Sequence, residues 1–449
     1  MSQLDVAVIG AGVAGLGAAW ALGRRHRVTL YERDRRLGGH SNTIEVPWRG
    51  GSVAVDTGFI VYNTETYPNL VRLFGHLGVE TRPSNMSFAV SLDGGRLEYA
   101  GDSLGAVFAQ KRNLVNLRHY AMLRDVLRFY RNAPDLLVAP DAGVTLGFYL
   151  HAERYSAGFI EDHLLPMAAA IWSCSTRQIL SFPAVSFVRF FANHGLLRLG
   201  DQPQWRTVAG GSREYVRRIA RSLGSSARPG FGVAALRRLG DGVEVVDGSG
   251  QRRRHDRAVM AVHADQALAL LADADAEERA VLGAFAYQRN HAYLHQDESL
   301  MPRRRAVWSS WNYLGQRDGD GGRSVSVTYW MNRLQGIDPD CRLFVSLNPR
   351  RLPSDHGTIA AFAYDHPLFD ARALAAQASL PAIQGRRRVW FSGSYCGYGF
   401  HEDALSSGLA AATALGAPPP WQLVPQPATG GVGALPLEGR IAAAPSADD

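Results

Sequence analysis

Residues 6–15 read VAVIGAGVAG, an apolar strand that runs into three closely spaced glycines. The alanine-rich segment that follows predicts a helix, and residues 28–31, VTLY, predict a second buried strand that ends in Glu32. A strand, a glycine turn, a helix and a strand with a terminal acid, in this order, form the βαβ unit that binds dinucleotides. The stretch therefore predicts an α/β domain built on a parallel sheet.

Each glycine of the turn meets a physical requirement of that unit. Gly10 permits the tight turn, Gly12 lets the backbone approach a pyrophosphate, and Gly15 lets the helix pack closely on the strand. The helix N-terminus offers unpaired N–H groups to the phosphates, and Glu32 accepts hydrogen bonds from the ribose hydroxyls. An NAD-only dehydrogenase also satisfies these features, so the residues that follow decide between dinucleotides.

Four further blocks resemble flavoproteins of the amine oxidase and phytoene desaturase superfamily. Residues 37–43, LGGHSNT, are similar to its GGxxxT segment, and residues 55–60, VDTGFI, to its segment beside the isoalloxazine. Residues 208–215, VAGGSREY, are similar to its GG turn before a helix. Residues 389–393, VWFSG, and 399–408, GFHEDALSSG, resemble its final FAD motif, where a strand leads to a helix whose N-terminus faces the flavin. The resemblance implies FAD as the cofactor.

The turn and these blocks together assign the expected cofactor contacts. They are Gly10, Gly12, Val13, Ala14, Gly15, Glu32, Arg33, Gly38, Gly39, His40, Asn42, Thr43, Thr57, Gly58, Phe59, Val233, Gly393, Glu402, Asp403 and Ala404. By resemblance, the backbone of Val233 borders the adenine and Glu402 neighbours the ribityl chain or the pyrophosphate. His40 departs from the family, which usually has arginine there. An imidazole supplies less charge and titrates near physiological pH, which predicts a weaker hold on FAD.

The scattered cofactor blocks predict an FAD-binding domain, Rossmann-like and of the glutathione-reductase type, that is interrupted by two insertions. The FAD-binding domain takes residues 1–95, 206–284 and 383–416. A helical insertion and an insertion of mainly antiparallel strands form an α+β substrate domain from residues 96–205 and 285–382. Residues 417–449 are rich in Pro, Ala and Gly, which predicts a flexible C-terminal tail.

The composition excludes several classes of protein. The chain has 449 residues, of which 46% are hydrophobic and 20% charged, as in soluble globular proteins. Nothing resembles a signal peptide or a transmembrane helix, which predicts a cytoplasmic location. Cys174, Cys341 and Cys396 lack metal-type spacing, so we expect reduced thiols and no metal site. The net charge of +7 accompanies no nucleic-acid-binding module, so no nucleic-acid partner is expected.

The first insertion contains a basic amphipathic stretch. Apolar residues recur near helical spacing, and arginines occupy the other faces; the apolar set is Leu114, Leu117, Ala121, Leu123, Val126, Leu127 and Tyr130. One interpretation is a helix that turns its apolar side to the core, and the other is docking on the inner face of an anionic membrane. Three arginine runs, residues 252–254, 303–305 and 386–388, predict solvated turns, with contact to anionic lipid or an anionic substrate as the alternative.

The chemistry depends on which superfamily members the chain resembles. Amine oxidases of the superfamily place a lysine near flavin N5 from the second insertion, whereas the only lysine here, Lys111, lies in the first. This counts against a flavin amine oxidase, which stays an alternative. An aromatic-rich substrate domain instead resembles flavin-dependent desaturases and isomerases that act on long apolar chains.

Residues 56–63, 190–195, 329–335 and 399–402 look most like predicted flavoproteins often encoded with cyclopropane-fatty-acid-synthase-type methyltransferases. This resemblance implies an oxidoreductase that desaturates, isomerises or oxidises a fatty-acyl or phospholipid-acyl chain by hydride transfer to FAD. It also implies a lipid-modifying methyltransferase as a partner. A further alternative is a nonenzymatic flavin-binding protein that supports such a methyltransferase.

Seven side chains are expected nearest the reacting bond: Tyr62, His194, His291, Trp311, Tyr395, Cys396 and His401. Tyr395 and Cys396 follow the final cofactor strand, where family members bring side chains to the flavin face. Cys396 is either a site for a thioether to the flavin or, as is usual for buried cysteines, an inert thiol.

Overall fold

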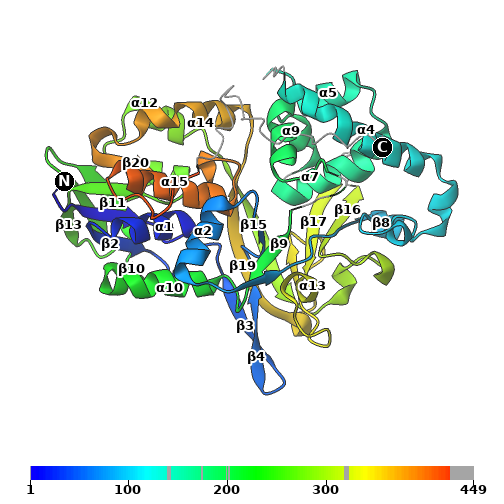
Figure 1. Ribbon diagram of the computed structural model, residues 1–449, viewed down its shortest axis with the longest axis horizontal. Coiled ribbons are helices and arrows are strands. Elements are labelled where there is room, and N and C mark those ends of the chain that lie inside the picture. Colours follow the sequence, from blue (N-terminus) through cyan, green and yellow to red (C-terminus); the bar gives the residue numbers. More distant parts are fainter. Residues whose placement is uncertain are drawn as a thin grey trace, which may run out of the picture.

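The computed structural model describes residues 2–138, 143–172, 175–198, 200, 203–317 and 323–424. The chain forms two halves that lie side by side (Figure 1). The half on the left contains a parallel sheet with helices, and the half on the right combines a large sheet with a group of helices above it. Cys174 falls outside the described residues.

A five-stranded parallel sheet forms the centre of the first half. Its middle strand is buried on both faces, which suits the uninterrupted apolar run at the start of the chain. The predicted α/β class with a parallel sheet is confirmed. The strand order is β10 (Ala227–Pro229), β2 (Arg27–Glu32), β1 (Asp5–Ile9), β14 (Arg257–Met260) and β20 (Val389–Phe391).

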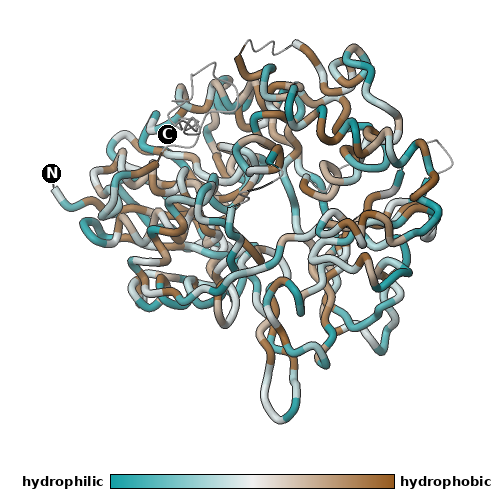
Figure 2. Tube along the Cα trace, turned by 45° about the vertical axis from the view of Figure 1, so that its right-hand side comes forward, coloured by the Kyte–Doolittle hydropathy of each residue, from teal (hydrophilic) through white to brown (hydrophobic). Residues whose placement is uncertain are grey.

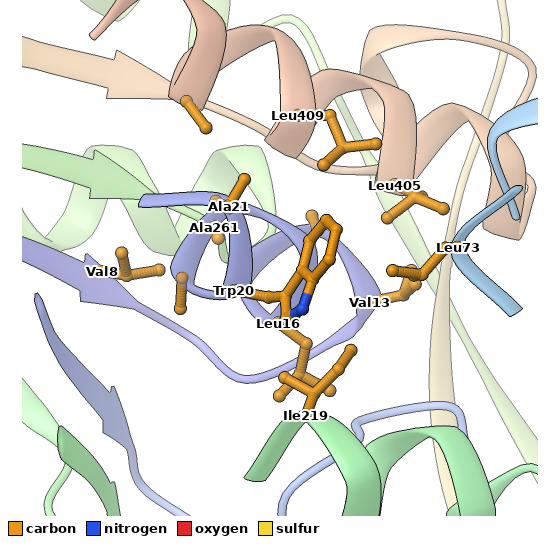
Figure 3. Packing of buried hydrophobic residues seen from close by; sticks show 14 of the residues in the cluster. Val8, Val13, Leu16, Trp20, Ala21, Leu73, Ile219, Ala261, Leu405 and Leu409 are labelled. Carbon is orange, nitrogen blue, oxygen red and sulfur yellow. The ribbon is translucent and has the colours of Figure 1, made fainter. Parts of the chain in front are cut away.

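One face of this sheet is covered by α1 (Val13–Leu22), which is buried along its whole length. Figure 3 shows Trp20 of α1 surrounded by Leu405, Leu73 and Ile219. These three side chains come from α15 (His401–Ala414), α2 (Pro68–Leu77) and α10 (Arg213–Leu223). Gly17 lets α15 approach, because a Cβ there would lie 2.5 Å from Leu405 Cδ1.

The opposite face carries a second apolar cluster, to which an antiparallel sheet and three helices contribute. The elements are β11 (Val233–Arg238), β12 (Val243–Asp247), β13 (Arg252–His255), α11 (Ala264–Leu270), α12 (Ala276–Leu282) and α14 (Ala371–Ile383). Helix α14, except for its last residue, lies within residues 285–382, which the sequence assigns to the substrate domain. It packs on the FAD-binding half because Ala373, Ala376 and Leu380 face this cluster.

A seven-stranded sheet forms the floor of the other half. All its neighbouring strands are antiparallel except β16 and β7. Strand β7 lies before residue 95, so the predicted domain boundary falls inside this sheet. The order is β19 (Thr358–Pro367), β15 (Tyr287–His295), β18 (Phe344–Leu347), β17 (Arg323–Trp330), β16 (Trp311–Arg317), β7 (Phe88–Leu92) and β8 (Leu97–Ala100), with α13 (Met331–Gln335) after β17.

Helices built from the first insertion stand above that sheet (Figure 1). They enclose a cluster of buried aromatic side chains that includes Phe129, Phe159, Phe187 and Phe191. The helices are α3 (Leu104–Val107), α4 (Leu117–Asn132), α5 (Leu146–Ala152), α6 (Ala157–Phe159), α7 (Leu165–Trp172), α8 (Thr176–Leu180) and α9 (Ala184–Asn193), with the 3₁₀ turn η2 (Lys111–Val115) before α4. No helix within the described segments is long and apolar enough to cross a membrane.

Short strands connect the two halves. The β3–β4 hairpin projects from the bottom of the molecule, and its tip is hydrophilic (Figure 2). The strands are β3 (Thr43–Trp48) with β4 (Gly51–Asp56), and β5 (Tyr62–Asn63) with β9 (Trp205–Val208) and β6 (Thr81–Pro83).

The first part of the predicted flexible tail is packed against the FAD-binding half. The ring of Trp421 stacks on Trp20 with centroids 5.6 Å apart, and the backbone N–H of Val424 donates to Asn69 Oδ1. Residues 417–424 thus differ from the prediction, because one large aromatic side chain anchors a segment that is otherwise poor in apolar residues. The rest of the predicted tail lies outside the described residues.

Candidate functional site

A cavity of about 710 Å³ lies where the two halves meet. Val13 and Ala404, from the first turns of α1 and α15, line it on the FAD-binding side. Trp311 and Tyr329 of the seven-stranded sheet and Phe190 of α9 line it on the other side. The cavity therefore runs from two helix N-termini to an aromatic chamber.

The turn between β1 and α1 has the geometry that a dinucleotide requires. Gly10 has a φ of +97°, and a Cβ there would lie 2.5 Å from the carbonyl oxygen of Ala261. A Cβ on Gly12 would instead face open space, and no side chain caps the N-terminus of α1. Unpaired N–H groups beside open space fit a pyrophosphate. The carboxylate of Glu32 closes the turn by accepting a 2.8 Å hydrogen bond from the N–H of Ala11.

Helices α1 and α15 bring their N-termini together. A Cβ on Gly408 would overlap the backbone carbonyl of Ala14, so the two helices are in backbone contact there. Val13, His401 and Ala404 consequently face the same cavity. The opening turn and the late GFHEDALSSG block, almost 390 residues apart in sequence, form one site, which fits FAD.

Arg36 holds the loop that follows Glu32, although the sequence analysis did not single it out. Its guanidinium donates to the carbonyl oxygens of Gly39, at 2.7 Å, and Ser41, at 2.9 Å. Gly38 donates its N–H to the carbonyl of Ala11, which ties the loop to the glycine turn. A permanent cation therefore lies beside the expected phosphate position. In the sequence, Arg36 directly precedes the LGG segment, and this position could have identified it.

The prediction that His40 titrates near physiological pH is wrong. Burial, together with the neighbouring His366 and His263, holds the pKa of His40 well below its usual value of 6.5. Its ring lies against Tyr364, with centroids 4.9 Å apart, and its Nε2 atom is buried without a hydrogen-bond partner inside the described chain. His40 is thus a neutral ring with one nitrogen available to a ligand in the cavity.

Two hydrogen-bonded networks fix the segment beside the cavity. The side-chain amide of Asn42 donates to Thr57 Oγ1 and to the Tyr364 hydroxyl, each at 3.0 Å. Thr43 donates to the Asp56 carboxylate at 2.6 Å, and burial raises the pKa of Asp56 to about 6. These residues hold Gly58 and Phe59, which line the cavity.

His401 and Phe59 close the floor of the cavity as a stacked pair. Their ring centroids are 3.8 Å apart and their planes are inclined by 6°. His401 Nε2 also lies 2.9 Å from the Tyr215 hydroxyl, and burial lowers the pKa of His401 to about 3. The imidazole is therefore neutral and fixed in position.

The remaining predicted cofactor residues divide into two groups. Arg33 lies next to Gly232, which precedes Val233, so these two predicted cofactor residues lie close together. Glu402 does not line the cavity. Its carboxylate accepts hydrogen bonds from the backbone N–H groups of Asn69 and Leu70 and caps α2, because only one side of the first turn of α15 faces the cavity.

Asp403 and Gly393 lie directly behind the cavity wall. Asp403 accepts a 2.9 Å hydrogen bond from the N–H of Phe400, and burial raises the pKa of its carboxyl to about 7. The carbonyl oxygen of Gly393 accepts a hydrogen bond from the Ser407 hydroxyl, and Gly393 does not line the cavity. Both residues shape the start of α15.

The structure brings together three of the seven side chains that are expected nearest the reacting bond. His194, Trp311 and His401 line the cavity, whereas Tyr62, Tyr395 and Cys396 do not. Tyr62 packs between Tyr67 and Phe74 in the core. His291 is exposed on β15, as expected for a residue on a strand surface.

Tyr395 and Cys396 turn away from the cavity because the chain forms a 3₁₀ turn over Ser394–Cys396. Tyr395 packs on Phe285 in the second apolar cluster. Burial raises the pKa of the Cys396 thiol to about 12, so it remains protonated. The geometry favours the inert thiol.

Most of the chamber wall was not predicted, although Trp172 and Phe190 belong to aromatic-rich stretches whose sequence fits either an apolar tunnel or a core. The additional lining side chains are Tyr99, Tyr130, His163, Met167, Trp172, Phe190, Tyr329, His366, Tyr398 and Phe400. They come from segments far apart in sequence, and each is also an ordinary core residue type, so no local pattern marks them. In the described segments, no group of three or more His, Cys, Asp or Glu side chains could hold a metal ion.

Comparisons with known proteins agree with this geometry. The family model for flavin-containing amine oxidoreductases matches residues 13–286. A Mycobacterium tuberculosis protein, provisionally named a flavin-containing monoamine oxidase, is 30% identical over 263 residues, which cover 55% of this chain and 54% of that protein. The chain thus spans about half the length of the curated relatives it matches.

Two solved structures share the fold. Cyclohexylamine oxidase from Brevibacterium oxydans superposes with a TM-score of 0.64 at 17% identity, covering 92% of this chain and 99% of that one. A fatty acid isomerase from P. acnes gives 0.64 at 15% identity, covering 93% and 99%. The resemblance found in the sequence and the predicted FAD cofactor are confirmed. The chain belongs to the flavin-containing amine oxidoreductase family.

Proposed function

We propose that this protein desaturates, isomerises or oxidises the hydrocarbon chain of a fatty acid or phospholipid. The observation that carries the proposal is the absence of an unpaired charge among the described residues of the chamber wall. Two carboxylates reach the wall, and both are paired: Asp102 with Arg333 at 2.9 Å, and Asp365 with Arg289 at 3.1 Å. An apolar chain suits such a wall better than a cationic amine.

The histidines of the chamber support the same substrate class. Burial lowers the pKa of both His163 and His194 to about 4, so both rings are neutral at physiological pH. His194 is stacked on Phe190, with centroids 3.9 Å apart, and presents an aromatic surface. The Tyr99 hydroxyl lies 3.0 Å from His163 Nδ1 and is thereby satisfied within the protein.

The position of the lysine adds a second argument. Lys111 does not line the cavity; it lies in a separate cleft with Arg303 and Arg304. Amine oxidases of the superfamily have a lysine from the second insertion near the flavin. In the described structure no other segment brings a lysine to the cavity in its place. Both an amine oxidase and a fatty acid isomerase share this fold. The choice between an amine and an acyl substrate therefore depends on the residues that line the chamber.

FAD, when bound, supplies the redox chemistry by accepting a hydride or electrons from the substrate. The turn at Gly10–Gly12 and the loop held by Arg36 would bind its phosphates. The residues around Gly58 and His401 would border its ring system. The aromatic wall excludes water and keeps an acyl chain next to the cofactor, so the protein contributes binding, orientation and desolvation.

Anaerobic mixing of the holoprotein with dispersed fatty acids and phospholipids tests the proposal. We expect the visible flavin absorbance to bleach and mass spectrometry to find acyl chains changed by two hydrogens, or isomerised with recovery of the flavin colour. A panel of monoamines and polyamines serves as the control. Bleaching by amines alone, with unchanged acyl chains, would establish an amine oxidase instead. Bleaching by neither class, with stable co-purification of a lipid methyltransferase, would support the nonenzymatic role.

A further inference from the structure

The exposed apolar side chains of the molecule are concentrated in one region. Of the eleven large hydrophobic residues that are exposed in the described structure, eight lie between residues 104 and 148. The most exposed neighbours are Val115 and Leu117, whose exposed fractions are 83% and 85%. Such a concentration marks an interaction surface, because soluble proteins otherwise scatter exposed apolar residues singly.

Helix α4 presents Leu117 and Leu127 to solvent, whereas Leu123 packs against an apolar cluster. The buried side is formed by His119, Met122, Asp125 and Phe129. The core-facing interpretation of Leu117 and Leu127 from the sequence is therefore wrong. These leucines lie on the outer side with Tyr120, Arg124 and Arg131, at positions that are three or four residues apart and so share one helix face.

A basic cleft of about 650 Å³ adjoins this face. Its lining includes the cations Arg96, Lys111, Arg112, Arg303 and Arg304 and a single carboxylate, Asp93. Arg96 pairs with Asp93, and Arg304 pairs with the buried Glu98. Within the described segments, Lys111, Arg112 and Arg303 have no carboxylate partner. The cleft therefore carries excess positive charge.

The cleft and the apolar face are parts of one surface. The turn η2 contains both Lys111 and Arg112 of the cleft and the exposed Leu114 and Val115. The Tyr120 hydroxyl donates to the carbonyl of Leu114 at 3.0 Å, which joins η2 to α4. We call this the η2–α4 surface: the five cleft cations with Leu114, Val115, Leu117, Tyr120, Arg124, Leu127 and Arg131.

The same helix also bounds the reaction chamber. Tyr130 of α4 lines the cavity, and so do Gly101 and Asp102, which immediately precede α3. Leu104, at the start of α3, is exposed. Residues of the chamber wall and of the η2–α4 surface are therefore close neighbours in sequence, as Tyr130 and Arg131 are on α4.

We propose that the η2–α4 surface docks on an anionic phospholipid bilayer and that acyl chains enter the chamber beside α4. Apolar side chains flanked by cations match a membrane interface, where the apolar groups insert between lipids and the cations meet phosphate groups. The entry route rests on the proposed acyl-chain function, whereas the docking stands on the surface alone.

Vesicle flotation of the holoprotein tests the docking. We expect binding to vesicles of phosphatidylglycerol and phosphatidylcholine, weak binding to phosphatidylcholine alone, and release at about 1 M salt, where charges are screened within about 3 Å. Lys111→Gln with Arg303→Gln is expected to lower the partition constant by about 25-fold, or roughly fivefold for each cation. Leu117→Ser is expected to weaken binding even at low salt.

Matched variants outside the surface serve as controls. Arg237→Gln with Arg253→Gln removes two exposed cations from β11 and β13, at the opposite end of the molecule (Figure 1). Leu352→Ser removes another exposed leucine. Both controls are expected to bind vesicles like the wild type. Equal loss in these controls and in the surface variants would overturn the proposal, since binding would then follow total charge or hydrophobicity.

Other occupants of the surface give distinct results. A dimer in solution that Leu117→Ser dissociates, without vesicle binding, would assign the surface to a second copy of this chain. Binding of inorganic phosphate without vesicle binding would assign the cleft to a soluble anion. Bleaching of the flavin by a soluble short-chain acyl substrate separates the two proposals, because it tests the chamber without the membrane. Vesicle binding without any acyl chemistry would support the docking proposal and contradict the proposed acyl-chain function.

Discussion

The imidazole of His401 lies parallel to the ring of Phe59 at a centroid distance of 3.8 Å. One ring belongs to the first turn of α15, and the other follows β4 near the start of the chain. Because both line the cavity, their contact joins distant parts of the polypeptide at the place where the cofactor ring system is expected.

The stack between these two rings is expected to contribute to stability as a pair. In a double-mutant cycle with Phe59→Ala and His401→Ala, we expect a coupling energy of about 0.5–1.5 kcal/mol, the range typical of aromatic pairs. Urea unfolding of the four proteins measures it. A cycle between Phe59→Ala and Phe148→Ala, which is exposed on α5, should be additive. A coupling near zero in the first cycle would show that the stack is not energetically significant.

Gly12→Ala is expected to separate folding from cofactor binding. A Cβ at this position faces open space within the protein, so the unfolding midpoint of the flavin-free protein should stay near that of the wild type. The same methyl group would occupy the space through which the pyrophosphate approaches, so the purified variant should be colourless. Gly240→Ala, where a Cβ also meets nothing, is the control and should retain FAD. A yellow Gly12→Ala protein would contradict the assigned phosphate position.

Glu402→Gln is expected to destabilise the protein without altering the flavin. The carboxylate accepts two backbone N–H groups at the start of α2, at 2.9 and 3.0 Å, and an amide would place its own NH₂ against one of them. We expect a loss of about 1–3 kcal/mol in the free energy of unfolding, as for other buried donors left unsatisfied. The visible spectrum of the bound FAD should be unchanged. A changed spectrum at wild-type stability would return Glu402 to the cofactor site.

Acid is expected to destabilise the chamber through its buried histidines. Burial lowers the pKa of His194 to about 4 from its usual 6.5, so its contribution to stability is complete above about pH 6.5 and is lost as the pH falls towards 4. The stability advantage of the wild type over His194→Gln should therefore shrink by roughly 2–3 kcal/mol between pH 7 and pH 4. Unfolding midpoints across this pH range measure it. A stability advantage that is the same at pH 7 and at pH 4 would contradict this prediction.

The sequence predicts those parts of the site that depend on backbone geometry. At Gly10, Gly12 and Gly15 a side chain would block a turn, a ligand or a helix contact, so the requirement is visible in the residue type. Arg36 was missed because its role is to bind carbonyl oxygens of a neighbouring loop, which any surface arginine could do.

Other features depend on tertiary packing and leave no local pattern. The periodicity of α4 marks an apolar stripe, but burial of His119, Met122 and Asp125 divides it, so that Leu117 and Leu127 are exposed while Leu123, Val126 and Tyr130 pack inward. Tyr395 follows the correct strand, yet a 3₁₀ turn rotates it into the core. The chamber wall gathers single aromatic residues from many elements, and their partners are known only once the chain is folded.

The contact between Gly408 and the carbonyl of Ala14 has a consequence for biosynthesis. A nascent chain that has not yet released residues 401–414 from the ribosome holds the glycine turn but lacks the helix that completes its seat. Flavin capture must then wait until that helix has left the ribosome, and the earlier segments have to remain folded, or chaperoned, around an incomplete pocket until it arrives.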